Sequence, residues 1–344
     1  MDEAKGSFGA FLARKQVIIS FKRYFVDAMG AMAFGLFASL LIGTIFDTVA
    51  DQTGWAWLAA ASTYCSAATG PAMAVAIGHA LNAPSVVLFS LCAVGASGNA
   101  LGGPLGTLFA AIVGAELGKI VSKETKVDIL VTPTVTILSG CAIAALIGPG
   151  VNAIMNGFGA LVMRATELEP FFMGILVSVI VGVVLTLPIS SAALCAALGL
   201  TGLAGGAATA GCCAQMVGFA VMTFRENGWG GIAAQGLGTS MLQMGNIARN
   251  PRIWLPPTLA SAVTGPVATC IFRMENGIAV ASGMGTCGLV GPIGVAAAEG
   301  FSGGMDWLGM FLVCIVLPAL LTPLIAWPMR KAGWIREGDC KLDL

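Results

Sequence analysis

Charged side chains are scarce in this sequence. Asp, Glu, Lys and Arg make up only 10% of the 344 residues, while 57% are hydrophobic and the mean hydropathy is +0.90. Soluble domains carry about 25% charged residues, and no long charged block is present here that could fold as a separate soluble domain. The composition therefore excludes an ordinary soluble protein and predicts an all-α polytopic membrane protein.

Histidine is almost absent too, since His79 is the only one in the chain. This excludes metal sites built on histidine pairs, and it leaves His79 as the one histidine on which a Ser-His-Asp or Cys-His arrangement could be built, which makes such catalysis a remote alternative. The 10 cysteines do not replace them, because most lie inside apolar segments, where a free thiol behaves as a small hydrophobe. We expect no metal, no cofactor and no intrinsic catalytic centre.

Basic residues gather at the chain ends and in a few loops, and the net charge is zero. This distribution gives no reason to expect nucleic acid, but it orients a membrane protein, because Lys and Arg collect on the cytoplasmic side. Lys22 and Arg23 precede the first apolar span, and Arg330 and Lys331 follow the last one, so both termini are expected in the cytoplasm. Within the basic residues 1–23, a short amphipathic helix is expected to lie on the lipid surface.

The apolar segments predict about 10 transmembrane helices, at about 20 residues per crossing, some of them broken or re-entrant. Residues 85–121 are too long for one crossing, and Gly102-Gly103-Pro104 interrupts them. The lysine-rich loop that follows favours a return to the cytoplasm, so we predict a helical hairpin. Residues 129–147 form the next span, which Gly148-Pro149-Gly150 is expected to end before a short segment at 151–165. The glycine-rich residues 277–295 are expected to be re-entrant.

A weak internal repeat is visible. Residues 127–140 align with 251–265, which places Pro133-Thr134 over Pro257-Thr258. The repeat predicts two membrane halves, 24–170 and 171–330, between the cytoplasmic lead-in 1–23 and a cytoplasmic tail 331–344. Transporters built from repeats bind their substrate between them, near the bilayer midplane. Whether the halves are inverted or parallel is left open.

Uncharged polar residues are concentrated between 186 and 258. If 235–250 is one helix, its amides and hydroxyls fall within an arc of about 80°. Such groups donate to and accept from the hydroxyls of a solute without the desolvation penalty of a charge. Interhelical hydrogen bonding is the alternative reading of the same stripe. The residues predicted to bind a solute are Asn99, Thr134, Ser190, Ser191, Gln215, Gln235, Thr239, Gln243, Asn246 and Thr258.

Two carboxylates lie within or next to apolar segments. Glu116 lies one turn before the lysine-rich loop, and Glu226 follows an apolar run in Arg225-Glu226-Asn227. An intramembrane carboxylate is what coupling of transport to protons or ions would need. Interfacial snorkelling of Glu116 and a local ion pair of Glu226 are the simpler alternatives.

Long motifs carry a family resemblance. They are KRYFVDAMGAMAFGLFASLLIGTIF, KETKVDILVTPTVT, LTLPISSAALCAALGL, GCCAQMVGFAV, RENGWGG, QGLGTSMLQ, NPRIWLPPTLAS and GMGTCGLVGP. With them the chain resembles the bacterial stand-alone membrane proteins of the second type of phosphotransferase-system (PTS) sugar-permease IIC component. The resemblance implies a homodimer in the bacterial inner membrane that binds a sugar while separate IIB- and IIA-type proteins supply phosphate.

One departure from better-known IIC families leaves the coupling open. Their Gly-Ile/Val-Thr-Glu loop is represented here only by Gly285-Thr286-Cys287-Gly288, which has no glutamate. The first expectation is a transporter of a small neutral, sugar-like solute. The alternatives are a secondary transporter without phosphotransfer, and a membrane sensor or regulator that binds a ligand without moving it.

Overall fold

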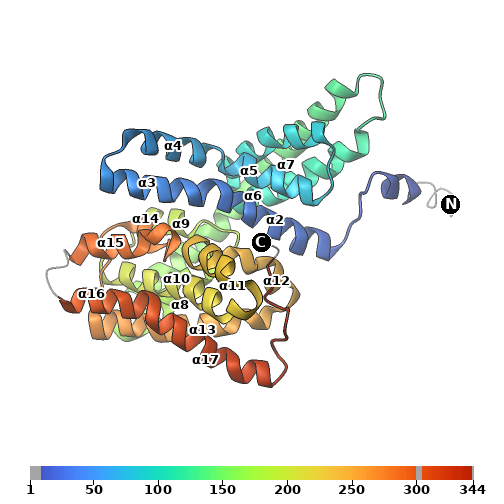
Figure 1. Cartoon of the computed structure of the whole chain (residues 1–344). Helices are drawn as coiled ribbons and strands as arrows, with labels where there is room; N and C mark the ends of the chain where they lie inside the picture. The colour runs from blue at the N-terminus through green and yellow to red at the C-terminus, as the bar shows by residue number, and fades with distance from the viewer. Residues whose placement is uncertain (1–8, 300–303, 343–344) are drawn as a thin grey trace. The chain divides into compact units, whose positions relative to one another are not determined.

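The fold is helical throughout the part of the chain that the structure describes, residues 9–299 and 304–342. The structure is a computed structural model (Figure 1). In these ranges the only β-type pairing is an isolated antiparallel bridge between Gly202 and Asn276. Residues 1–8 of the predicted lead-in and 343–344 of the predicted tail lie outside the described residues. The predicted all-α class is confirmed.

Six helices in the described residues are long and apolar enough to cross a membrane, which confirms a multi-pass membrane protein. They are Arg23–Asp47, Ser85–Val121, Asp128–Thr166, Gly202–Met222, Pro251–Phe272 and Gly304–Lys331. Two shorter apolar helices, Pro170–Thr186 and Cys287–Ala298, lie beside these in the sequence.

The chain folds into two compact units, each discontinuous in sequence. The first comprises Met1–Gly43 and Thr63–Ala153, and the second comprises Thr44–Ser62 and Ile154–Leu344. The elements up to the middle of the chain are η1 (Arg23–Asp27), α2 (Ala28–Leu36), η2 (Phe37–Leu41), α3 (Ile42–Thr53), α4 (Ala56–Ala67), α5 (Thr69–Ala80), α6 (Ser85–Val121) and α7 (Asp128–Thr166).

In the first unit α5 packs against both α2 and α6. Small residues permit this packing: a Cβ added at Gly70 would collide with the backbone of Gly95, and one at Gly95 with the backbone of Gly70. Where lipid is as apolar as the side chains, close backbone approach is a main source of helix association.

Helix α6 is the predicted hairpin. Its backbone leaves helical geometry at Gly102 and at Gly103, where φ is 57° and ψ is −153°, a region essentially restricted to glycine. The two arms then run antiparallel, since Gly98 faces Thr107 and Gly118 faces Val87. Both ends of the hairpin therefore lie at the same end of the first unit.

The expected end of the next span is wrong. Helix α7 continues through Gly148-Pro149-Gly150 to Thr166, so residues 151–165 are its last turns. A proline removes only one backbone donor from a helix. At membrane depth, ending the helix would leave several backbone groups without partners, and apolar helix formers on both sides favour continuation.

The second unit is organised around α10 (Gly202–Met222). This helix packs against α8 (Pro170–Thr186), α13 (Leu255–Pro266) and α17 (Leu317–Lys331). In the most hydrophobic stretch of α10, 89% of the helix is buried inside the protein. The remaining elements are α9 (Ser191–Ala197), α11 (Phe224–Ile232), η3 (Ala233–Gly238), η4 (Ser240–Gln243), α12 (Met244–Arg249), η5 (Pro251–Trp254), η6 (Val267–Phe272), α14 (Ala279–Ser282), η7 (Cys287–Leu289), α15 (Val290–Glu299), α16 (Gly304–Phe311) and η8 (Leu312–Val316).

Candidate functional site

Three interrupted segments of the second unit meet at α10. They are the break between α8 and α9, the break between η3 and η4 at Thr239, and the glycine-rich turn between α14 and η7. Hydrogen bonds join them: Ser191 donates to the Gly283 carbonyl at 2.7 Å, and Thr286 donates to the Gly236 carbonyl. Irregular backbone at membrane depth occurs where it is covered by protein or lines a cavity, and in transporters such breaks mark the substrate site.

A buried polar group lies at this meeting point, and we call it the Gln215 cluster. Its members are Thr186, Gln215, Ser240, Trp254 and Thr258. Gln215 Oε1 accepts hydrogen bonds from the Thr186 hydroxyl at 3.3 Å and from the Trp254 indole N–H at 3.1 Å. Its Nε2 donates to the Thr258 hydroxyl at 3.2 Å. The hydroxyls of Thr186 and Ser240 lie 2.8 Å apart.

The chemistry of the Gln215 cluster is neutral. None of its five members carries a charge, and Thr186, Gln215 and Ser240 are fully buried. A buried amide that bridges hydroxyls and an indole can exchange these partners for the hydroxyls of a solute without moving a charge out of water. The cluster is therefore suited to a hydroxyl-rich neutral ligand.

The stripe expected on one helix is divided in the structure. Residues 233–238 form a π-helical turn and 240–243 a 3₁₀ turn, with extended backbone at Thr239 between them. Gly236 and Gly238 weaken helix formation here, and the Thr239 hydroxyl accepts a hydrogen bond from Met241 N at 3.2 Å. Thr239 thus caps the second turn.

The three amides of the stripe nevertheless meet. Gln243 Nε2 donates to Gln235 Oε1, and Asn246 Nδ2 donates to Gln243 Oε1, both at 2.8 Å. Gln235 Nε2 donates to the Thr223 hydroxyl at 2.9 Å. The resulting chain of amides is buried, with exposed fractions of 0% for Gln235 and Gln243 and 6% for Asn246.

The C-terminal tail, residues 332–342, lies against this chain of amides. Gln243 Nε2 donates to the Cys340 carbonyl at 3.0 Å, and Asn246 Nδ2 donates to the Lys341 carbonyl at 2.9 Å. Asn227 donates to the Cys340 carbonyl at 2.9 Å and accepts from Leu342 N at 2.8 Å. The stripe is satisfied by main-chain carbonyls of this tail.

Three other residues predicted to bind the solute, Ser190, Thr134 and Asn99, do not belong to the Gln215 cluster or to the chain of amides. Ser190 accepts from Ala193 N at 3.2 Å as the N-cap of α9. Thr134 is exposed on α7 and donates to the Leu130 carbonyl one turn earlier. Asn99 is half-buried on α6 of the first unit.

Three members of the Gln215 cluster were not predicted from the sequence: Thr186, Ser240 and Trp254. A signal was present for two of them. Thr186 lies just before the Pro188 break, and Trp254 precedes Thr258 by four residues, so it shares a helix face with it. Ser240 carries no such signal, because only the break at Thr239 turns it toward Thr186.

The two carboxylates considered for coupling are ion-paired. Glu116 lies 2.7 Å from Lys119 Nζ and 4.0 Å from Arg23 Nε, and Lys119 also donates to the Leu81 carbonyl at 2.9 Å. Glu226 lies 3.1 Å from Arg330 Nη2. Both carboxylates are thus held beside fixed cations.

The reactivity of the Cys340 thiol can be used to measure whether the tail is docked. Its Sγ is buried, and burial raises the pKa of the thiol to about 12, so the reactive thiolate is scarce at pH 8 while the tail stays in place. Asn227→Ala removes two hydrogen bonds to the tail, each contributing about 1 kcal/mol. Together they make about 2 kcal/mol, so we expect maleimide labelling of Cys340, measured by peptide mass spectrometry, to accelerate about thirtyfold.

The matched control for this experiment is Asn156→Ala, which removes an exposed asparagine on α7. It is expected to leave the labelling rate of Cys340 unchanged. Equal rates in the wild type and in Asn227→Ala would show that Asn227 does not hold the tail.

Comparison with known proteins gives one match. A family model described as "Phosphotransferase system, EIIC" matches residues 26–342. No curated protein and no solved structure matches the chain. The matched range contains the whole Gln215 cluster and leaves out the basic lead-in before residue 26. The match confirms the resemblance that the sequence motifs indicate.

Proposed function

The chain belongs to the phosphotransferase-system EIIC family, and from this premise we propose that it binds a small, neutral, hydroxyl-rich solute at the Gln215 cluster and carries it across the membrane. The family implies sugar transport by way of the phosphotransferase system. The solute is thus a sugar or a close relative, held by hydrogen bonds.

The observation that carries the proposal is the neutrality of a buried polar cluster at a meeting of broken helices. Gln215 uses its oxygen and its nitrogen toward three neighbours, and none of these neighbours is charged. An ion or a charged substrate would need compensating charge at the site. Ser191 and the Gly283 turn extend the site by closing the adjacent break.

The wider organisation is proposed as follows. The protein is a homodimer with about 10 crossings, at about 20 residues each, built from the repeats 24–170 and 171–330 in the bacterial inner membrane. Both termini face the cytoplasm, where separate IIB- and IIA-type proteins supply phosphate. One supporting observation is that Arg14 pairs with Glu124 at 3.1 Å, which brings the lead-in and the lysine-rich loop to one end of the first unit.

A panel of solutes tests the proposal. We expect uncharged sugars and polyols to raise the thermal unfolding temperature of the detergent-purified protein, because they bind the folded state alone. Sugar phosphates and amino acids serve as charged comparisons and are expected to give smaller shifts. A panel in which only charged solutes stabilise the protein would contradict a neutral site.

Uptake into proteoliposomes then separates the modes of transport. Appearance of labelled phosphate on the solute, when IIB- and IIA-type proteins are added, is the expected result. Uptake that requires a pH or sodium gradient would indicate a secondary transporter. Binding without flux in the same vesicles would indicate a sensor.

A further inference from the structure

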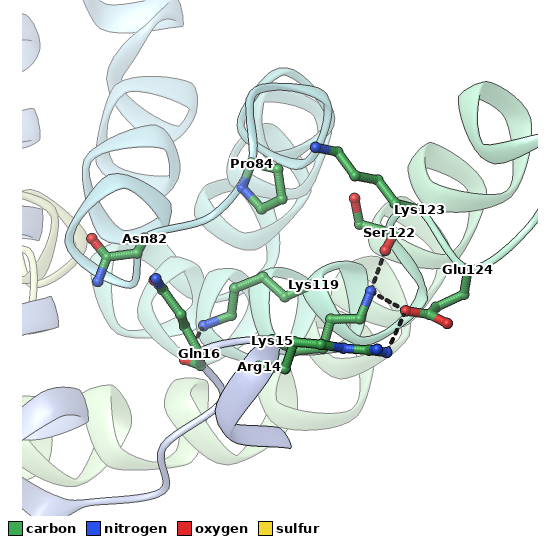
Figure 2. A pocket seen from close by; sticks show the side chains of 9 residues that line it. All are labelled: Arg14, Lys15, Gln16, Asn82, Pro84, Lys119, Ser122, Lys123 and Glu124. Carbon is green, nitrogen blue, oxygen red and sulfur yellow. Dashed lines mark hydrogen bonds and ion pairs between the residues drawn. The ribbon is translucent and has the colours of Figure 1, made fainter. Parts of the chain in front are cut away.

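A basic pocket lies at one end of the first unit, and none of the residues that line it is among those proposed to bind the solute. Its volume is about 490 Å³. It is formed by the lead-in, the turn before α6, the end of α6 and the loop that follows (Figure 2). The lining residues are Arg14, Lys15, Gln16, Asn82, Pro84, Lys119, Ser122, Lys123 and Glu124.

The lining carries four cationic side chains against one carboxylate. Glu124 pairs with Lys15 at 2.5 Å and with Arg14 at 3.1 Å, and the hydrogen bond from Lys15 holds the pKa of this carboxyl below its ordinary value. Glu124 is therefore ionised at neutral pH and offsets one of the positive charges, and Glu116, paired with Lys119 at 2.7 Å, offsets a second. The pocket keeps an excess of positive charge.

Two of the cations are anchored to the protein and two extend outward. Lys119 donates to the Gln16 carbonyl at 3.0 Å, and Lys15 donates to the Ser122 carbonyl. Arg14 is two-thirds exposed, with a side-chain exposure of 66%. In Figure 2 the exposed Lys123 extends toward Pro84, and no dashed line joins its ammonium to another residue drawn. Lys123 is thus available to an anion, and so are the guanidinium N–H groups of Arg14 other than those on Nη2, which pairs with Glu124.

Apolar side chains on the lead-in are exposed next to this charge. Ile18, Ile19 and Phe21 are 53%, 82% and 64% exposed, and they lie between the basic residues and the first span, which begins at Arg23. Basic residues followed by exposed apolar ones are the pattern of a segment that lies at the lipid interface. An anion reaching the pocket from this side has apolar neighbours.

We propose that this pocket binds a phosphate group, that Arg14 and Lys123 contact it, and that the headgroup of an anionic phospholipid supplies it. The cations match the charge of the phosphate, and Ile18, Ile19 and Phe21 lie where acyl chains would pass. Lys and Arg near a membrane surface each strengthen binding to anionic lipid about fivefold. This inference rests on the first unit alone and is independent of the solute site.

The test compares lipids on the full-length protein. Thermal unfolding is measured in phosphatidylcholine vesicles, in the same vesicles with phosphatidylglycerol, and in phosphatidylcholine vesicles with inorganic phosphate. We expect phosphatidylglycerol to raise the unfolding temperature and inorganic phosphate to leave it unchanged. An equal rise with inorganic phosphate would overturn the lipid as the source.

Substitutions of the lining residues test whether phosphatidylglycerol binds in the pocket. Lys123→Gln and Arg14→Gln are expected to weaken the binding of fluorescent phosphatidylglycerol about fivefold each. The matched control is Lys126→Gln, which removes the same charge from the same loop but does not line the pocket. It is expected to leave the affinity within a factor of two. Equal losses for Lys123→Gln and Lys126→Gln would overturn the pocket in favour of diffuse attraction.

Unfolding temperatures in phosphatidylcholine alone separate binding from folding. All three variants replace exposed side chains, so they are expected to match the wild type there. Loss of the phosphatidylglycerol effect in a variant with an unchanged unfolding temperature would support the proposal. Retention of the full effect in the Arg14→Gln/Lys123→Gln double variant would overturn it.

Discussion

Replacing Gln215 by leucine is expected to weaken solute binding about 100-fold. The change removes the amide that, in our proposal, exchanges Thr186, Trp254 and Thr258 for hydroxyls of the solute, and each buried solute hydroxyl left without a partner costs about 1–3 kcal/mol. A loss of about 2.7 kcal/mol corresponds to a factor of about 100 in the dissociation constant. The affinity for the best neutral solute, measured by thermal stabilisation, checks this expectation.

Two threonines on α13 provide the matched pair for this experiment. Thr258→Val removes a hydroxyl that accepts from Gln215, and it is expected to weaken binding about tenfold. Thr264→Val removes a buried hydroxyl that donates to the Ser261 carbonyl on its own helix, and it is expected to leave affinity unchanged. If Thr264→Val weakened solute binding as much as Thr258→Val does, the proposal that the solute binds at the Gln215 cluster would be contradicted.

The amide stripe can be compared with the Gln215 cluster by the same measurement. Gln243→Leu removes hydrogen bonds to Gln235 and to the Cys340 carbonyl. If the stripe serves to dock the C-terminal tail, this variant lowers the unfolding temperature and changes solute affinity less than Gln215→Leu does. An equal or larger loss of affinity would move the solute site to the stripe.

Breaking the ion pair between Glu116 and Lys119 is expected to be the most destabilising change in the first unit. Lys119→Met leaves the buried Glu116 carboxylate without its nearest cation, and removal of one partner of a buried pair costs about 3–5 kcal/mol. The double variant Glu116→Gln/Lys119→Met removes both charges, and it is expected to recover much of the loss. Thermal unfolding of the single and double variants measures the coupling between the two residues.

The control for the ion pair is Lys126→Met, which changes an exposed lysine of the neighbouring loop and is expected to alter stability by less than about 0.5 kcal/mol.

Uptake measurements distinguish a coupling role of Glu116 from a structural one. A Glu116→Gln variant that folds like the wild type but loses gradient-driven uptake would assign this carboxylate to coupling. Loss of folded protein with unchanged specific uptake would assign it to the framework of the first unit.

Features with a local cause were predictable from the sequence. The hairpin in α6 follows from Gly102 and Gly103, because the conformation of Gly103 is open only to glycine. The break before α9 follows from Pro188. At Gly148-Pro149-Gly150 the same reasoning failed, because one proline removes a single hydrogen bond, while ending α7 in lipid would leave several backbone groups unpaired.

The partners of the polar residues depended on contacts between distant segments. The spacing of Gln235, Gln243 and Asn246 indicated that they share a face, and they do form one chain of hydrogen bonds. Nothing in that spacing indicated that main-chain carbonyls from 340 and 341 would satisfy them.

By itself, the sequence determined that this is an all-helical membrane protein with breaks at particular glycines and prolines, since hydropathy and backbone sterics act within a few residues. Only the tertiary structure decided which amide meets which acceptor. An amide hydrogen-bonds equally well to a side chain, a solute or a main-chain carbonyl. Gln215 meets Thr258 and Trp254 because α10 packs against α13, and Gln243 meets Cys340 because the tail returns to the second unit.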